Sequence, residues 1–170
     1  MKKFLIIAFM LAVSALSFGQ TSYDAVGIGG TITGPVGGRA TLAVTAAPIV
    51  YIAVNGVPDT NLTGGQITFK TGTKVNGTPQ LGDTFAAGGS FVISSTDLGT
   101  IFSGTFSAGA SWQPAALSNG AHFYTLTGTV TDAAGDVGAF VLTTTTDSSI
   151  TCFFSGSETI AQIDISLNIN

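Results

Sequence analysis

The chain has 170 residues, of which 45% are hydrophobic and only 8% are charged. Disordered chains show the opposite balance, so this composition indicates an ordered domain with a hydrophobic core. The sequence holds nine acidic and five basic side chains, and its formal net charge is −4. Binding to nucleic acid or to an anionic membrane surface needs clustered Lys and Arg, so neither kind of partner is expected.

The first 19 residues have the three parts of a secretory signal peptide. Met1 is followed by two lysines, and an uncharged apolar stretch then runs from Phe4 to Val13. That stretch is shorter than the roughly 20 residues that a bilayer anchor needs, so we expect no stable membrane insertion. Small residues favour cleavage after Gly19, and cleavage after Ala15 fits the same rule. We therefore predict export by the general secretory route to the periplasm, the cell surface or the medium.

Removal of residues 1–19 leaves residues 20–170, which is the length of one domain. Three basic side chains remain against nine acidic ones, a net charge of −6. A domain of about 150 residues buries about 70% of its unfolded surface and folds without a metal or a disulfide. Cys152 is the only cysteine, so no bridge can form within the chain. We expect a buried thiol there, with an intermolecular disulfide as the alternative.

Apolar and polar residues alternate through most of this domain, beginning at residues 26–32. The same alternation recurs at residues 101–106, 123–131 and 157–170, and it is typical of a β-strand with one buried face. Asn-Gly and Gly-Gly pairs separate such runs, and Asn-Gly favours the tight turn of a β-hairpin. No convincing helical stripe and no internal repeat interrupts the pattern. The sequence therefore predicts an all-β domain, and we expect an antiparallel β-sandwich.

Several short motifs lie in the middle of the chain. They are GGSFVI at residues 88–93, FSGTF at residues 102–106, Trp112, and YTLTGTV at residues 124–130. In these stretches, which fall within residues 65–145, the chain resembles exported β-rich proteins of environmental bacteria. No activity is established for those proteins, so the resemblance implies an exported β-domain and assigns no site residue.

Residue types that carry catalysis are scarce in this sequence. His122 is the only histidine, and we expect it to face solvent at the entrance of a strand. Glu158 is the only glutamate, and we expect it to be exposed as well. Asp164 lies six residues further on and therefore about 20 Å away along a strand, which is too far for the carboxylate pair of a glycosidase. The sequence predicts no catalytic residue, and a secreted hydrolase is the least favoured function.

Calcium is the one cofactor that the sequence leaves open. Asp132 and Asp136 flank Ala-Ala-Gly in a short loop, and carboxylate oxygens are ligands that suit Ca²⁺. The loop is shorter than an EF-hand loop and has no bidentate Glu. Asp and Gly are also the residues that a hairpin turn prefers, so an ordinary turn is the alternative.

Aromatic side chains are the other candidates for ligand binding. Trp112 and Tyr124 are expected either to form an exposed platform that stacks on sugar rings or to pack in the core, which is the commoner role. The core is expected to contain the phenylalanines at positions 91, 102, 106, 140 and 154.

The two ends of the domain alternate cleanly and carry few of the charges that protect a sheet edge. We therefore expect residues 25–33 and 159–169 to lie at edges, where strand addition would join two copies of the chain. The leading function is an exported structural or interaction protein without catalytic activity. A polysaccharide-binding module and a pilin-like self-assembling subunit are the alternatives.

Overall fold

The computed structural model describes residues 20–34, 41–59, 64–78, 82–107, 109–116, 122–146 and 157–170. Every regular element in these ranges is a β-strand, so the all-β prediction is confirmed. The expected signal peptide and Cys152 lie outside the described residues. The strands are β1 (Thr21–Gly27), β2 (Thr31–Thr33), β3 (Ala43–Val54), β4 (Val57–Pro58), β5 (Gln66–Thr71), β6 (Lys74–Thr78), β7 (Gly82–Phe85), β8 (Gly88–Ser95), β9 (Gly99–Phe106), β10 (Ala110–Ala116), β11 (His122–Asp132), β12 (Val137–Thr146) and β13 (Ser157–Ile169).

The strands close into an antiparallel barrel with eight strand positions. Around the ring, β3 pairs with β5, β5 with β8, β8 with β9, β9 with β11, β11 with β12, and β12 with β13. The short strands β1 and β2 share the eighth position, because each pairs with β13 on one side and with β3 on the other. Outside the ring, β10, β7 and β6 extend the sheet from β11, and β4 forms a hairpin with β3.

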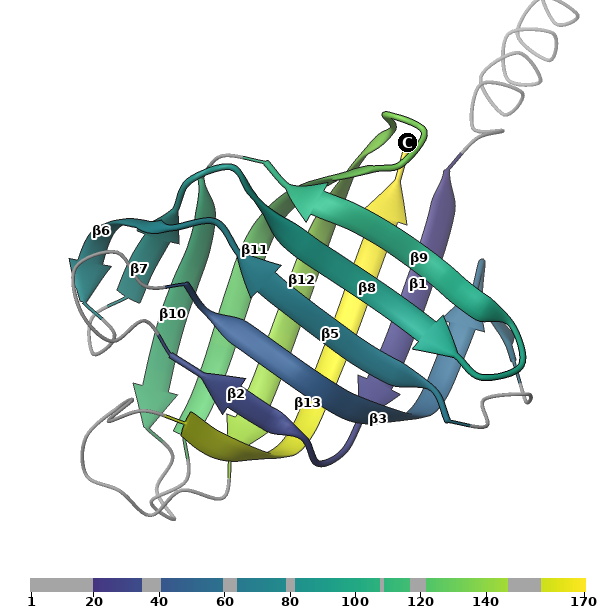
Figure 1. Cartoon of the computed structure of the whole chain (residues 1–170), viewed down its shortest axis with the longest axis horizontal. Helices are drawn as coiled ribbons and strands as arrows, with labels where there is room; N and C mark the ends of the chain where they lie inside the picture. The colour runs from purple at the N-terminus through teal and green to yellow at the C-terminus, as the bar shows by residue number, and fades with distance from the viewer. Residues whose placement is uncertain are drawn as a thin grey trace, which may run out of the picture.

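Figure 1 shows the barrel as two crossed layers, with β2, β3, β5, β8 and β9 in front of β10, β11, β12, β13 and β1. The expected sandwich is not confirmed, because strand pairing joins these layers into one closed sheet. The layers are connected by β9–β11 on one side and by β1 and β2 on the other. A barrel wall and a sandwich sheet have the same inward and outward alternation, so the residue pattern does not distinguish them.

Long strands bend where they pass between the layers. β13 pairs with β2 through Ser157–Thr159 and with β1 further along its length. In β3 the register shifts between Val44 and Ala47, and Ala46 has a positive φ of 51°. Gly30 lies against this bend with a φ of +82°, and a Cβ atom on it would stand 2.8 Å from the Ala47 Cα. Glycine is therefore required at this corner of the barrel.

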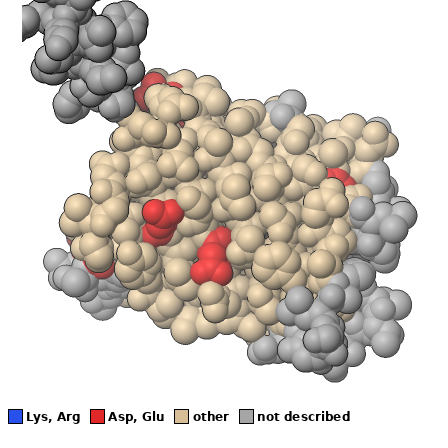
Figure 2. All heavy atoms as spheres, turned by 180° about the vertical axis from the view of Figure 1, so that it is seen from behind, with Lys and Arg blue, Asp and Glu red and all other residues tan. Residues whose placement is uncertain are grey.

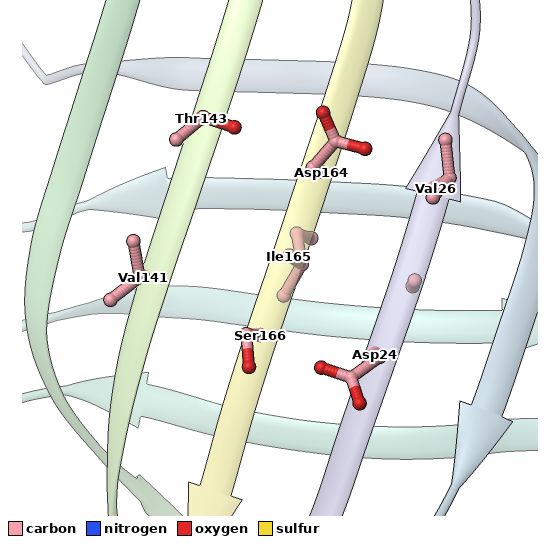
Figure 3. Close-up of a pocket in the computed structure, with 8 residues that line it drawn as sticks. Asp24, Val26, Val141, Thr143, Asp164, Ile165 and Ser166 are labelled. Atoms are coloured by element: carbon pink, nitrogen blue, oxygen red, sulfur yellow. The ribbon is translucent and has the colours of Figure 1, made fainter. Parts of the chain in front are cut away.

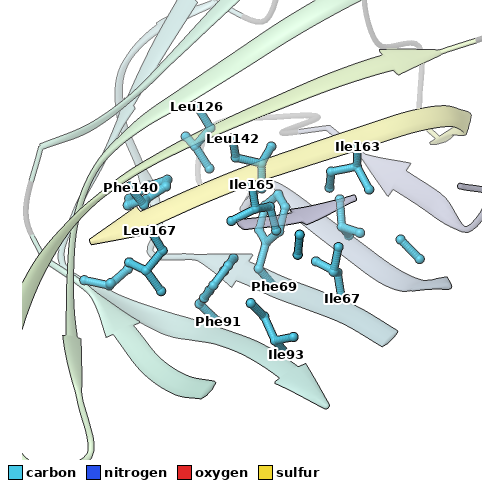
Figure 4. Packing of buried hydrophobic residues seen from close by; sticks show 14 of the residues in the cluster. Ile67, Phe69, Phe91, Ile93, Leu126, Phe140, Leu142, Ile163, Ile165 and Leu167 are labelled. Carbon is cyan, nitrogen blue, oxygen red and sulfur yellow. The ribbon is translucent and has the colours of Figure 1, made fainter. Parts of the chain in front are cut away.

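Inward-facing apolar side chains fill the barrel (Figure 4). Phe69, Phe91, Phe106 and Phe140 come from four different strands, and their neighbouring ring centroids lie 5.2–6.4 Å apart. Burying one such side chain contributes about 1.5–3 kcal/mol. The aliphatic part of this core includes Ile67, Ile93, Leu126, Leu142, Ile163, Ile165 and Leu167. The expected core positions 91, 102, 106 and 140 are buried, and position 154 lies outside the described residues.

From their alternation we expected the two terminal segments to be free sheet edges, but they are not. β1 pairs with both β13 and β3, and β2 pairs with the same two strands. β13 is also paired on its other side, with β12. Barrel closure brings the two ends of the domain against each other, so residues 25–33 and 159–169 satisfy one another's backbone groups. The edge on which strand addition would depend is therefore absent at these segments.

Candidate functional site

A groove of about 290 Å³ lies on the outer wall of the barrel, where β12, β13 and β1 run side by side (Figure 3). Successive strand residues point to opposite faces, so only alternate side chains reach this wall. Ala25 and Ile165 are buried core residues beneath the groove. The other lining residues are Asp24, Val26, Val141, Thr143, Asp164 and Ser166.

The strand register fixes which groove side chains are neighbours. Asp164 on β13 is opposite Thr143 on β12 and Val26 on β1. Two residues along β13, Ser166 is opposite Asp24. Side chains at directly opposite positions have Cβ atoms about 5 Å apart, and diagonal neighbours are about 7–8 Å apart. Asp24 and Asp164 are therefore diagonal neighbours on adjacent strands. The other two corners of this square are Ser166 and Val26.

This wall of the barrel is weakly acidic. The Gln162 side-chain amide donates to both carboxylate oxygens of Asp164, at 3.0 and 2.9 Å, and so orients that carboxylate. In the view from behind, isolated acidic groups stand in an uncharged surface, and no basic group of the described residues is seen (Figure 2). Lys70 and Lys74 are on β5 and β6, away from the three groove strands. An anionic ligand would meet repulsion here, and neither of the two described lysines is on a groove strand to offset it.

Tyr51 is an exposed aromatic side chain beside the groove. It is opposite Val26 on the β1–β3 pair, so the two side chains share the outer face of the sheet. The exposed fraction of Tyr51 is 42%, and its neighbour Val50 is 52% exposed. The residues alone gave Tyr51 no priority as a ligand-binding aromatic, because only the strand register places it next to Val26, which has Asp164 on its other side.

Trp112 and Tyr124 do not form an exposed platform. Both side chains are fully buried, and their rings stack with centroids 4.6 Å apart and planes 16° apart. They come from the neighbouring strands β10 and β11 and point to the inner face of the sheet. Of the two roles expected for Trp112 and Tyr124, the structure shows packing in the core.

Tyr124 also belongs to a buried quartet of side chains with polar groups, together with His122, Thr146 and Glu158. The Tyr124 hydroxyl donates to the Glu158 carboxylate, with distances of 2.9 Å to Oε1 and 3.0 Å to Oε2. The Thr146 hydroxyl donates to Glu158 Oε2 at 2.7 Å. The Nδ1 atom of His122 lies 3.1 Å from the Tyr124 oxygen and 3.4 Å from Glu158 Oε2. Hydroxyl groups from two strands thus solvate a carboxylate that water scarcely reaches.

The expected exposure of His122 and Glu158 is wrong, because their exposed fractions are only 3% and 5%. For Glu158 the cause is an irregularity in β13. Thr145 pairs with Gln162 but Thr146 pairs with Ile160, which leaves Ala161 as an extra residue. The extra residue reverses the facing of everything before it, so Glu158 points inward.

Burial, together with the neighbouring Glu158 carboxylate, raises the pKa of the Tyr124 phenol well above its ordinary value. Ionising the phenol would place a second negative charge beside a carboxylate in a poorly solvated site. Tyr124 therefore remains protonated and acts as a hydrogen-bond donor. The quartet is suited to holding a buried charge in place.

Asp83 on β7 is a second buried carboxylate, opposite Trp112. The Lys74 ammonium nitrogen lies 3.9 Å from its Oδ1, and no hydrogen bond from the described residues reaches either carboxylate oxygen. Burial raises the pKa of the Asp83 carboxyl above its ordinary value, and the Lys74 charge offsets part of this rise. The charged form of Asp83 is therefore poorly compensated in the folded protein.

The Asp132–Asp136 loop is the turn between β11 and β12. Asp132 Oδ1 accepts hydrogen bonds from the backbone N–H groups of Ala134 and Asp136, both at 2.9 Å. An Asp side chain commonly accepts such backbone hydrogen bonds in a tight turn, so the loop has the features of an ordinary turn. Within the described ranges, no group of three or more His, Cys, Asp or Glu side chains comes close enough to hold a metal ion. No further His, Cys, Asp or Glu side chain of the described residues forms such a group with Asp132 and Asp136.

A second groove, of about 240 Å³, lies on the outer face of β8, β9 and β11. Its one carboxylate is that of Asp132, which is engaged in the turn. Its lining has no aromatic side chain and consists of Ser90, Val92, Ser103, Gly104, Thr105, Thr131, Asp132 and Ala133. This groove is similar in size to the first, but it has one carboxylate where the first has two, so it provides a matched control.

Comparison of the chain with models of known protein families, with curated proteins and with solved structures gave no match. In the part of the chain that the structure describes, no helix has the length and hydrophobicity needed to cross a membrane. Functional assignment therefore depends on the geometry and chemistry of the outer groove and of the buried quartet.

Proposed function

We propose that this chain is an exported interaction protein without catalytic activity, and that it holds its partner on the outer wall of the barrel. The groove formed by β12, β13 and β1 is the observation that supports this assignment. It presents polar groups to solvent at fixed spacing, while the inward side chains beneath it are close-packed core. A rigid sheet that needs no rearrangement is a suitable support for such a surface.

The other functions considered have less support. Self-assembly of a pilin-like subunit depended on free terminal strands, and both terminal strands are paired within the barrel. A hydrolase built on His122 or Glu158 would need these groups to reach a substrate, and both are buried. Binding at the outer wall requires neither condition.

Export is tested by measuring the intact mass of the protein recovered outside the cytoplasm. Removal of residues 1–19 should leave a chain that begins at Gln20. A full-length mass with Met1 retained, found in the cytoplasm, would contradict the export part of the proposal.

Binding at the groove is tested by sedimentation with the insoluble cell-envelope fraction of the producing bacterium. Ser166→Lys places a long side chain between Asp24 and Asp164 and should abolish co-sedimentation. Thr105→Lys adds the same group to the second groove and should have no effect. Equal sedimentation of the two variants would refute the groove as the binding surface. Release of reducing sugar ends by the wild type would refute the absence of catalysis.

A further inference from the structure

The groove and Tyr51 together form one continuous strip on the outer wall. The outward residues Thr143, Asp164, Val26 and Tyr51 occupy opposite positions on β12, β13, β1 and β3. Adjacent strands are about 4.8 Å apart, so the strip from β12 to β3 is about 14 Å long. That length exceeds one sugar ring, and the strip has both a polar part and an aromatic end.

The side chains of this strip match the two kinds of surface that a sugar presents. A carboxylate accepts hydrogen bonds from two neighbouring hydroxyl groups, and the Gln162 amide fixes the Asp164 carboxylate in one orientation. The hydroxyl of Thr143 both donates and accepts. The exposed ring of Tyr51 offers an apolar face to the C–H face of a sugar ring, and burial of the two faces is favourable.

The charges on this wall select against anionic ligands. Asp24 and Asp164 repel polyanions, and the view in Figure 2 shows no basic group of the described residues that would attract them. The same carboxylates are not joined by a third metal-ligating side chain among the residues that the structure describes. An uncharged ligand with many hydroxyl groups fits both the carboxylates, which accept hydrogen bonds from its hydroxyls, and the exposed ring of Tyr51.

We propose that the strip binds a neutral oligosaccharide, with Tyr51 stacking on one sugar ring and Asp164 accepting hydrogen bonds from the hydroxyls of the next. This inference rests on the proposed function, because it names the partner of the same surface. Tyr51 and Asp164 are separated by Val26 alone, so adjacent rings of one chain can reach both. Asp24 lies two residues along β1 from Val26, and it accepts hydrogen bonds from hydroxyls at the side of the same ligand.

The test is isothermal titration of the exported protein with cellohexaose, laminarihexaose, mannohexaose and xylohexaose, and with an alginate oligomer as the polyanion. At least one neutral hexasaccharide should bind, and alginate should not. Tyr51→Ala should weaken that binding at least about tenfold, as expected for loss of a stacked aromatic ring. Tyr51→Phe keeps the ring and should bind like the wild type. Asp164→Asn should weaken binding, and Thr105→Ala in the second groove should not.

Three outcomes would overturn this inference. They are the absence of binding to every neutral hexasaccharide at millimolar concentration, binding that Tyr51→Ala and Asp164→Asn leave unchanged, and binding that disappears on removal of calcium by EDTA. Each leaves the broader proposal open to its own test, because sedimentation that depends on Ser166 does not require a sugar. Conversely, hexasaccharide binding followed by cleavage would support the neutral-glycan inference and contradict the absence of catalysis.

Discussion

Replacing Tyr124 with Phe tests what the buried quartet contributes to stability. The change removes one hydroxyl group and keeps the ring that stacks on Trp112, so the packing of the core is preserved. The Glu158 carboxylate loses the donor that reaches both of its oxygens, and it keeps the Thr146 hydroxyl at 2.7 Å. A hydrogen bond to a buried charged group contributes about 1.5–3 kcal/mol, so we expect the free energy of unfolding to fall by about 2 kcal/mol.

Urea unfolding followed by the fluorescence of Trp112 measures this loss. In a domain of this size, 1 kcal/mol corresponds to about 2–4 °C, so the midpoint of thermal unfolding should fall by about 4–8 °C. Thr143→Val removes a hydroxyl from the outer wall and should change stability by less than about 0.5 kcal/mol. The cost of Tyr124→Phe should also be smaller when Glu158 is already Gln, because the hydroxyl then no longer donates to a charge.

Alkaline pH gives a second readout of the same bond. Burial raises the pKa of the Tyr124 phenol, so the folded protein holds this proton more tightly than the unfolded chain does. The resulting stabilisation is complete below the unfolded pKa of about 10 and is lost progressively as the pH rises above it. Wild type should therefore lose stability more steeply than Tyr124→Phe above about pH 10. A variant within about 0.5 kcal/mol of wild type, with the same alkaline slope, would refute this account.

Two further predictions concern Asp83 and Gly30. Burial raises the pKa of Asp83, so its contribution to stability is greatest below about pH 4 and falls as the pH rises through the folded pKa. Asp83→Asn should therefore be more stable than wild type at pH 7, by about 1 kcal/mol in urea unfolding. Asp97 is exposed, so Asp97→Asn should show no such gain. A less stable Asp83→Asn would contradict the reasoning. Gly30→Ala combines a positive φ with a contact of 2.8 Å to the Ala47 Cα, so it should lower the free energy of unfolding by more than about 2 kcal/mol. Gly56 has a similar φ but open space around it, so Gly56→Ala should lower that free energy by about 1 kcal/mol. Equal losses in urea unfolding would show that the corner at Gly30 relaxes freely.

The sequence predicted the strand content and the core phenylalanines because period-two alternation reports facing directly. His122 was available from the same signal. It is in phase with Tyr124 and Leu126, and all three point inward on β11. Its position shortly after an Asn-Gly pair in the sequence suggested solvent exposure at the strand entrance, but β11 begins at His122 with the side chain already facing inward. Phase along a strand was the better guide at this residue than nearness to a turn.

The outer groove was beyond the sequence because it depends on which strands are neighbours. Asp24 and Asp164 are 140 positions apart in the chain, and only barrel closure makes β1 and β13 adjacent. Tyr51 joins them through the second pairing of β1, with β3. Each of these residues read alone is an outward-facing side chain on a strand. Their proximity results from closure of the sheet, and the alternation of residues does not predict closure.

One extra residue in β13 accounts for both the barrel corner and the buried quartet. Strict alternation back from Ile163 would place Ala161 inside and Glu158 outside. Because Ala161 is not matched on β12, the facing changes at this point, and the strand before it leaves β1 and pairs with β2. The residue that becomes inward at the corner is the one glutamate of the chain, so it needs donors from the neighbouring strands. Thr146 and Tyr124 supply them, which ties β11, β12 and β13 together where the sheet turns to close.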